Sequence, residues 1–397
     1  MARKKIELTD DTVDPGGQPE TRTGEPLELG FFAWNIRGGM TMSKATLRNN
    51  DRERDFWTWP NSRRLVEQAE AIGFDYQVPF GRWVGSGGET DFNGAALDFL
   101  ASAAATAPIT SRMGLFSTAH ITFKFHPLHI AKFGATIDHI SNGRWGLNIV
   151  SGYQAQEMAA FGLDPIDHDE AYEMAEEFTV LMKYLWTEAE PFDFEGKYYQ
   201  SYGAVVNPRP TRRPRPVLMN AGMSTRGLTF GARNVDWIFT LAPDIEGYRA
   251  KVDEAHNLAG KFNRSIRAAT MSWVLAEATD ELAQEKFEEL RSEIDRDALL
   301  GYARQLTGVD RWKDQATDEL ADDPYAGLGK EFYEGYALGF TSPQLVGSPE
   351  TIAEKMRALN QEAGLESLLL CFEDPQKGLH AMEDDILPIL KKMGLRR

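Results

Sequence analysis

Polar side chains follow several apolar segments of this sequence, at the positions where buried strands are expected to end. They occur at 34–39, 118–120, 148–153 and 220–225. In parallel α/β barrels the ligand lies at the carboxyl ends of the strands, so these segments are the first candidates for binding or catalysis. Their amides, hydroxyls and imidazole suit hydrogen bonding to a polar ligand and proton transfer.

The segment 220–225 reads Asn-Ala-Gly-Met-Ser-Thr and precedes a predicted helix. Free backbone N–H groups and the helix dipole at such a start can bind a phosphate. Ser224 also fits an ordinary N-cap of its own helix. From the residues alone, the two interpretations are about equally supported.

Asn148 interrupts an apolar strand, where a buried amide needs hydrogen-bond partners. It is either a satisfied residue of the barrel interior or a ligand contact, and its place favours the contact. His120 fits either a general base or a buried imidazole with satisfied hydrogen bonds. Tyr153, Trp34 and Phe32 could flank a planar ring or fill the core.

Metal chemistry finds little support in the sequence. The single cysteine, Cys371, can form neither an internal disulfide nor a cysteine zinc site. The seven histidines form neither an HExxH helix nor an HxH pair, so we predict no metal. Glu89 and Asp91 have a loop spacing that is typical of solvated carboxylates rather than of an acid–base pair.

Composition narrows the class of protein. The 397 residues carry a formal net charge of −17, and 42% of them are hydrophobic. This balance favours a globular fold and argues against nucleic-acid and membrane partners. The one basic cluster, at 209–215, is interleaved with prolines and is typical of a connector. No run of 18 apolar residues occurs and residues 1–25 are polar, so we predict a cytoplasmic protein.

Apolar strand-like segments alternate with helical patterns, which is typical of a parallel α/β fold. The predicted strands are 27–34, 75–79, 113–118, 145–150, 216–220, 237–241, 268–276 and 368–372. The predicted helices are 62–73, 95–105, 128–140, 171–186, 225–233, 247–259 and 282–294. No GxGxxG follows a strand, so a closed (β/α)8 TIM barrel is favoured over a doubly wound sheet.

Three segments depart from this rhythm. Residues 1–26 are predicted to be a flexible leader before a single barrel domain at 27–397. The segments 192–199 and 203–206 predict a short hairpin after the fourth helix. An acidic, glycine-rich insertion at about 295–346 lies between strands seven and eight and is a candidate lid.

Five segments occur in an order that is specific to one family. They are ATIDHISNGRWGLNIVSGY at 135–153, HDEAYEMAEEF at 168–178, FDFEGKYY at 192–199, NAGMSTRG at 220–227 and LVGSPETIAEKM at 345–356. They resemble the bacterial luciferase-like flavin monooxygenases, in the group that contains the dimethylsulfone and pyrimidine monooxygenases. NIRGGMTMSK at 35–44 looks like the sulfone branch and 85–92 like the pyrimidine branch, whereas Tyr153 stands where the pyrimidine branch has tryptophan.

The resemblance implies roles for individual residues. The implied catalytic residues are Thr118, which would face the place where O2 meets the flavin, and Asn148, which would contact the flavin ring; we add His120 as a candidate. The implied contacts to the FMN cofactor are Asn148, Ser151, Tyr153, Ala221, Gly222, Ser224 and Thr225. Of these, Gly222, Ser224 and Thr225 would bind the phosphate, with Tyr153 near it.

The resemblance also implies the reaction and its partners. A separate NAD(P)H-dependent flavin reductase supplies reduced FMN, and O2 is the co-substrate for oxygenation of a small organic molecule, with cleavage of a C–S or C–N bond. A homo-oligomer, dimer or tetramer, is expected. Two alternatives share the barrel, namely a deazaflavin-dependent oxidoreductase and a non-catalytic barrel that binds a phosphorylated metabolite.

Overall fold

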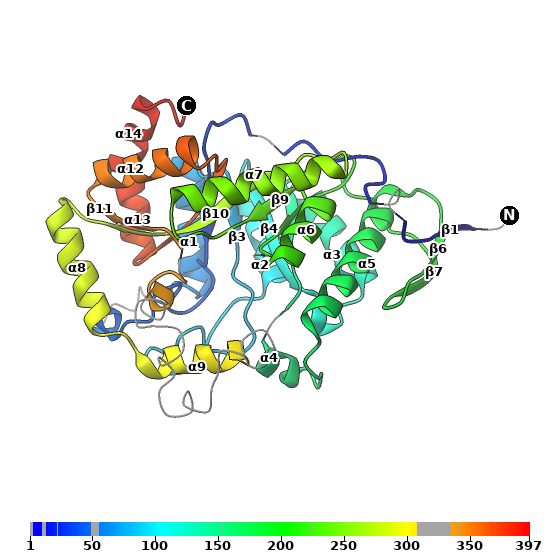
Figure 1. The fold of residues 1–397 in the computed structure, drawn as a ribbon, viewed down its shortest axis with the longest axis horizontal. Helices are drawn as coiled ribbons and strands as arrows, with labels where there is room; N and C mark the ends of the chain where they lie inside the picture. The colour runs from blue at the N-terminus through cyan, green and yellow to red at the C-terminus, as the bar shows by residue number, and fades with distance from the viewer. Residues whose placement is uncertain are drawn as a thin grey trace.

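A closed barrel of parallel strands forms the centre of the structure (Figure 1). The computed structural model describes residues 3–9, 13–21, 23–48, 55–152, 154–222, 224–307, 335–340 and 342–397. The barrel strands are β2 (Glu28–Phe32), β3 (Tyr76–Val78), β4 (Gly114–His120), β5 (Trp145–Val150), β8 (Val217–Asn220), β9 (Trp237–Phe239), β10 (Arg267–Ala276) and β12 (Ser367–Phe372). Pairing of β9 with β10 and of β12 with β2 closes the circle. The predicted (β/α)8 fold is confirmed, and each predicted strand overlaps an observed one.

Helices surround the barrel. The helices that follow β2 to β9 are α1 (Trp59–Ile72), α2 (Phe99–Thr106), α3 (Pro127–Ile140), α4 (Ala155–Ala160), α5 (His168–Thr187), α6 (Thr225–Asn234) and α7 (Ile245–Lys261). Beyond β10 lie α8 (Asp280–Ser292), α9 (Arg296–Thr307), α12 (Pro349–Arg357), α13 (Pro375–Ala381) and α14 (Leu387–Lys392). No described helix combines the length and apolar character needed to cross a membrane. α4, α9, α12, α13 and α14 were not predicted.

Large rings facing glycines fill the amino-terminal end of the barrel. The ring of Tyr76 packs edge-on against Phe116 and Trp237, with centroid distances of 5.8 and 5.5 Å. A Cβ on Gly30 would lie 2.4 Å from the Tyr76 ring, and one on Gly146 would lie 2.3 Å from the Phe116 ring. The amino-terminal end of the barrel is therefore closely packed, and the open space lies at the carboxyl ends of the strands.

A small second sheet lies outside the barrel (Figure 1). It contains the predicted hairpin as β6 (Phe192–Glu195) and β7 (Gln200–Ala204), which pair antiparallel. Its third strand, β1 (Lys4–Ile6), pairs parallel with β6 and belongs to the segment that we predicted to be a flexible leader. Polar composition did not indicate this strand, because the pairing joins residues almost 190 positions apart.

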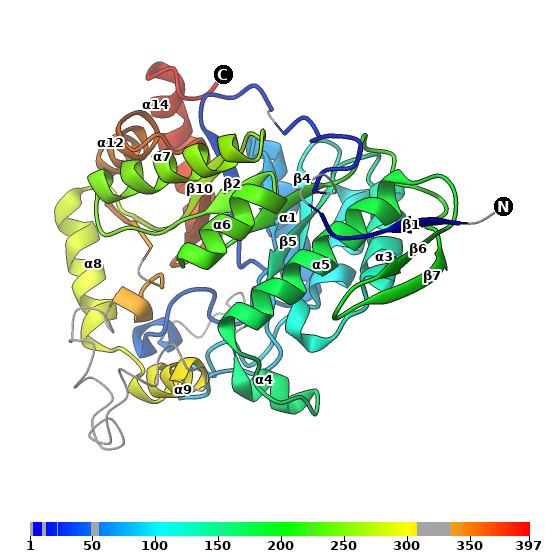
Figure 2. The same ribbon diagram turned by 45° about the vertical axis from the view of Figure 1, so that its right-hand side comes forward.

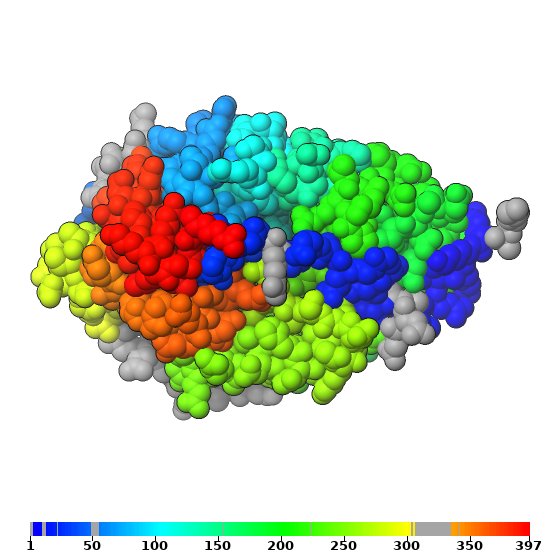
Figure 3. Space-filling view, turned by 90° about the horizontal axis from the view of Figure 1, so that it is seen from above, coloured from blue at the N-terminus to red at the C-terminus, as the bar shows by residue number. Residues whose placement is uncertain are grey.

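The rest of the leader crosses the amino-terminal end of the barrel. In Figure 3 it runs as a blue band between the red C-terminal elements and the green middle of the chain. Asp14 contacts two fully buried cations, with Oδ1 lying 2.9 Å from both Lys183 Nζ and Arg215 Nη2. Arg215 also pairs with buried Asp236 at 2.6 Å. These ion pairs fix the leader in place, which differs from the flexible segment that we predicted.

The predicted insertion contributes α9 and β11 (Gln344–Gly347) among the described residues. β11 pairs in parallel with β10 outside the barrel and was not predicted. Figure 2 shows α9 and α4 on the side opposite the leader, at the carboxyl ends of the strands. Residues 308–334 and 341 of this insertion lie outside the described residues.

Candidate active site

A cavity of about 380 Å³ opens at the carboxyl ends of the barrel strands. Every barrel strand contributes at least one residue to its wall: Phe32, Val78, Thr118 and His120, Asn148 and Val150, Asn220, Phe239, Met271 and Leu369. Loop residues, including Ser151, Ala221 and Gly222, and His168 at the start of α5 complete it. The structure therefore brings six of the predicted site residues around one space: Thr118, His120, Asn148, Ser151, Ala221 and Gly222.

Three predicted site residues are not among the described residues of the cavity wall. Ser224 and Thr225 continue the turn beyond Gly222 and are not part of the cavity wall. Tyr153 lies outside the described residues. The prediction that these residues contact a cofactor stays a prediction.

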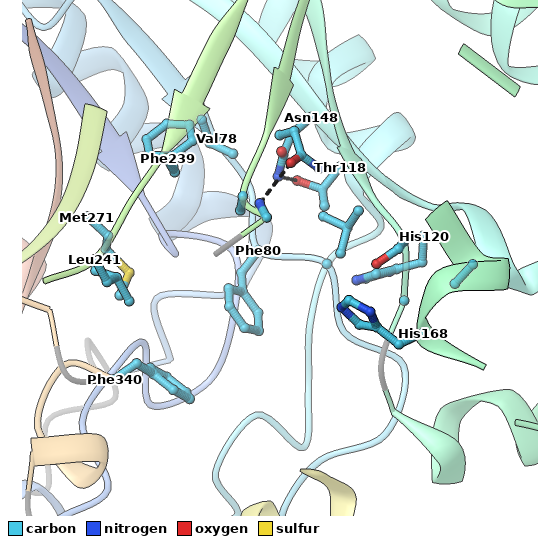
Figure 4. A pocket seen from close by; sticks show the side chains of 18 of the residues that line it. Val78, Phe80, Thr118, His120, Asn148, His168, Phe239, Leu241, Met271 and Phe340 are labelled. Atoms are coloured by element: carbon cyan, nitrogen blue, oxygen red, sulfur yellow. Dashed lines mark hydrogen bonds between the residues drawn. The ribbon is translucent and has the colours of Figure 1, made fainter. Parts of the chain in front are cut away.

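Asn148 and Thr118 are direct neighbours on β5 and β4. Asn148 Nδ2 lies 3.4 Å from Thr118 Oγ1, and the Thr118 hydroxyl donates to the Pro79 carbonyl at 3.2 Å (Figure 4). Asn148 Oδ1 is buried and has no hydrogen-bond partner. Because buried polar atoms are nearly always paired, this oxygen marks a place for a ligand N–H.

His120 ends β4 beside this pair and is only 7% exposed. Burial and, secondarily, the nearby Arg82 cation lower the pKa of its imidazole to about 3. The ring is therefore neutral at physiological pH, and its Nδ1 has no hydrogen-bond partner. A neutral imidazole can exchange hydrogen bonds with a ligand but cannot supply a positive charge.

The turn after β8 leads into the start of α6. Asn220 fixes the turn, because its Nδ2 donates to the Ile149 carbonyl at 2.7 Å and its Oδ1 accepts from the Gly222 amide at 2.8 Å. Ser224 caps α6 by accepting from the Gly227 amide at 3.0 Å, so the N-cap interpretation is confirmed. The cap uses one amide only, and the first amides of the helix have no intrahelical partner.

Two glycines allow an unusually close approach at this turn. A Cβ on Gly222 would lie 2.8 Å from the Gly227 Cα and 2.7 Å from the Tyr172 hydroxyl oxygen. Any larger residue at 222 would push the turn away from α6. The turn and the start of α6 are therefore in close contact at the edge of the cavity, and the free amides of a helix start can bind an anion.

Sequence reasoning missed two residues of α5 that complete this end of the cavity. His168 and Tyr172 line the cavity wall, and their rings lie 5.1 Å apart. His168 Nε2 lies 3.2 Å from Ser224 Oγ, which connects α5 to the cap of α6. The signal was the segment 168–178, which matched the family pattern but carried no individual role.

The remaining candidates have structural explanations. Trp34 is fully buried and donates from Nε1 to Gln77 Oε1 at 2.7 Å, outside the cavity wall. Glu89 and Asp91 form surface ion pairs with basic side chains, as the solvated interpretation predicted. Burial raises the pKa of the Cys371 thiol, so it is no ready nucleophile.

Comparison with known proteins identifies the family. A family model described as luciferase-like monooxygenase matches residues 28–367. The chain belongs to the luciferase-like monooxygenase family. The conclusion agrees with the resemblance of the five segments and with the closed barrel.

Curated relatives cover nearly the whole chain. The FMNH2-dependent dimethylsulfone monooxygenase of Pseudomonas putida is 26% identical over 374 residues, which is 94% of this chain and 98% of the relative. The pyrimidine monooxygenase RutA of a Bradyrhizobium strain is 30% identical over 376 residues, which is 93% of this chain and 99% of the relative. This luciferase-like monooxygenase thus spans the full length of both.

Solved structures share the barrel. A riboflavin lyase, RcaE, crystallised with modified FMN and riboflavin, has a TM-score of 0.82 at 25% identity, covering 94% of this chain and 92% of that one. DmoA of Hyphomicrobium sulfonivorans has a TM-score of 0.80 at 23% identity, covering 94% and 89%. The second likeness shows the fold alone.

Proposed function

We propose that this luciferase-like monooxygenase is the oxygenase of a two-component system, which uses reduced FMN and O2 to oxygenate a small organic substrate. One observation carries the proposal: a single cavity has the unpartnered Asn148 oxygen in its wall and, at its edge, the Gly222 turn that leads into the start of α6. A flavin ring has N–H donors and FMN has a phosphate, so both ends of the cofactor find matching groups. The names of the curated relatives support the same cofactor.

The phosphate end rests on the turn and the first residues of α6. We assign phosphate binding to the amides near Gly222 and Thr225 and to the Ser224 hydroxyl. His168, which lies 3.2 Å from Ser224 Oγ, positions that hydroxyl. A helix start suits a dianion because its free amides and its dipole point the same way.

The ring end rests on β4 and β5. Asn148 Oδ1 accepts from a ring N–H, while Thr118 holds the Asn148 amide by the contact at 3.4 Å. Reduced FMN, when bound, supplies the electrons that activate O2. The chain's own task is to orient ring and substrate and to exclude water, for which most of the cavity wall is apolar.

The substrate and partners extend this proposal. The relatives' names refer to a sulfone and a pyrimidine, which supports oxygenative cleavage of a C–S or C–N bond. A separate NAD(P)H-dependent flavin reductase is the partner that such chemistry requires, because the FMN must arrive reduced. Homo-oligomerisation and a cytoplasmic location stay predictions.

The test is a comparison of FMN with riboflavin, which lacks the phosphate. Ser224→Ala with Thr225→Ala is expected to weaken FMN binding by about 1–3 kcal/mol, because hydrogen bonds to a charged group are lost. Riboflavin affinity is expected to stay within about twofold, since such a change is well below that range. Fluorescence quenching of each flavin on titration with protein gives both constants.

Ser348→Ala is the matched control, because Ser348 caps the remote helix α12 in the same way. It removes a cap of similar energy, about 1 kcal/mol, without touching the cavity. Equal FMN affinity of the double variant and the wild type would place the phosphate elsewhere.

A further inference from the structure

The cavity has two chemically different sides. Figure 4 shows four side chains with polar atoms on one side: Thr118, His120, Asn148 and His168. It shows an apolar group on the other side: Val78, Phe239, Leu241, Met271 and Phe340. The ring of Phe80 stands between them. The proposed flavin contacts occupy the polar side, so the apolar side is left for a second molecule.

Stacked rings dominate the outer part of the apolar side. Phe80 and Phe340 lie 6.3 Å apart at an interplanar angle of 27°. Tyr302 meets Phe340 edge-on at 4.8 Å, and Tyr336 meets it edge-on at 5.8 Å. All four line the cavity, and together we call Phe80, Tyr302, Tyr336 and Phe340 the aromatic wall. Such rings bind another ring by offset or edge-to-face contact.

Among the described residues that line the cavity, none beside this wall carries a formal charge. The one carboxylate of the described lining, Asp167, accepts from the amides of Asp169 and Glu170 at the start of α5, beside His168. Moving a charged substrate group into apolar surroundings without a partner is costly. The wall therefore favours uncharged molecules.

A buried cation behind the wall strengthens this selection. The Arg82 guanidinium lies 4.9 Å from the Phe80 ring centroid and 5.5 Å from that of Tyr302. Its side chain is 2% exposed and it lies 3.7 Å from Glu157, which is equally buried. The positive charge contacts the Phe80 and Tyr302 rings and repels a second cation, while Glu157 offsets its attraction for an anion.

We infer that the substrate is an uncharged molecule that presents an aromatic ring to the aromatic wall. This inference rests on the proposed function, since it assigns the other side of the cavity to the flavin. It differs from a substrate such as dimethylsulfone, which has no ring; a pyrimidine has a ring but also carries several polar groups, for which the Phe80 and Phe340 rings offer no hydrogen-bond partner. The four-ring wall comes partly from the insertion, which supplies Tyr302, Tyr336 and Phe340.

A series of probes that share one shape tests the inference. Benzyl alcohol, benzoate and benzylamine carry the same ring with neutral, negative and positive groups, and cyclohexylmethanol replaces the ring by a saturated one. Binding to the protein loaded with oxidised FMN is measured by saturation-transfer NMR titration, which does not depend on turnover. We expect benzyl alcohol to bind about tenfold or more tightly than either charged probe, and about 2- to 10-fold more tightly than cyclohexylmethanol.

Variants that each remove one ring test whether the aromatic wall causes the preference for an aromatic probe. Phe80→Leu and Phe340→Leu keep apolar volume and are expected to abolish most of the preference for benzyl alcohol over cyclohexylmethanol. Phe133→Leu is the matched control, because Phe133 lies on α3 and is 53% exposed. We expect it to leave the preference unchanged.

Three results would overturn the inference: equal binding of a charged probe, tighter binding of uracil or dimethylsulfone than of benzyl alcohol, or an unchanged preference in both wall variants. Failure to bind FMN would instead contradict the proposed function. In that case the same titrations on the protein without FMN still decide whether the wall selects neutral rings.

Discussion

Replacing Gly222 with alanine tests the proposed phosphate turn with a single methyl group. Gly222 does not have a left-handed φ, so alanine can adopt its backbone conformation and the effect is purely steric. The new Cβ would lie 2.6 Å from Asn220 Oδ1, 2.7 Å from the Tyr172 hydroxyl and 2.8 Å from the Gly227 Cα. Contacts below 3 Å are not sustained, so the turn and the start of α6 must separate by several tenths of an ångström.

The expected magnitude follows from the hydrogen bonds that this shift would break. One charge-assisted hydrogen bond from a displaced amide to the phosphate is worth about 1.5–3 kcal/mol. The FMN dissociation constant is therefore expected to rise about 10- to 100-fold. Riboflavin has no phosphate, so its affinity for the Gly222→Ala variant is expected to match the wild type.

The assay is a parallel titration of both flavins, followed by thermal unfolding to verify the fold. Gly260→Ala is the control, since a Cβ on Gly260, in α7, would meet nothing within 4 Å. It is expected to leave both affinities unchanged. Wild-type FMN affinity in a folded Gly222→Ala protein, or an equal loss for both flavins, would refute the assignment of the phosphate to this turn.

Three further predictions concern residues around the barrel. Thr118→Val is expected to lower product formation from reduced FMN and O2 by about 100-fold, with FMN affinity little changed, as product and peroxide assays would show; normal turnover would make Thr118 a packing residue. His120 has a folded pKa of about 3, below its unfolded value, so the unfolded state takes up the proton and stability falls as pH drops from about 6.5 towards 3. The slope is about 1.4 kcal/mol per pH unit, and urea unfolding of His120→Asn at pH 7 and 5 is expected to lack it; identical acid sensitivity would contradict the burial argument. Asp14→Ala leaves Lys183 and Arg215 short of a counter-charge and is expected to cost about 3–5 kcal/mol in denaturant unfolding; unchanged stability would show that the leader is not anchored there.

The barrel could be predicted because its signals are local. Each strand is a short apolar segment bounded by turn residues, and the chain repeats strand and helix in order. β1 and β11 were not predicted, because each forms a strand by pairing with a distant segment and its own sequence has no clear strand pattern. Arg215 was assigned to a connector from its neighbours, yet it is fully buried between two carboxylates. Long-range ion pairs of this kind leave no periodic signal.

Site residues could be predicted from the sequence where a residue type was unusual for the segment around it. An amide inside an apolar strand led to Asn148, and a small-residue turn before a helix led to Gly222. The aromatic wall gave no such signal, because aromatic residues in loops are equally typical of core packing. Phe80 and Phe340 are 260 positions apart and meet only in the folded barrel.

A crystal structure of the protein with FMN tests the central claim most directly. The account predicts the phosphate at the start of α6, within hydrogen-bond distance of the Thr225 amide, and a ring N–H on Asn148 Oδ1. It also predicts that the aromatic wall stays open beside the ring. A phosphate bound away from α6, or a ring that leaves Asn148 Oδ1 without a partner, would contradict it.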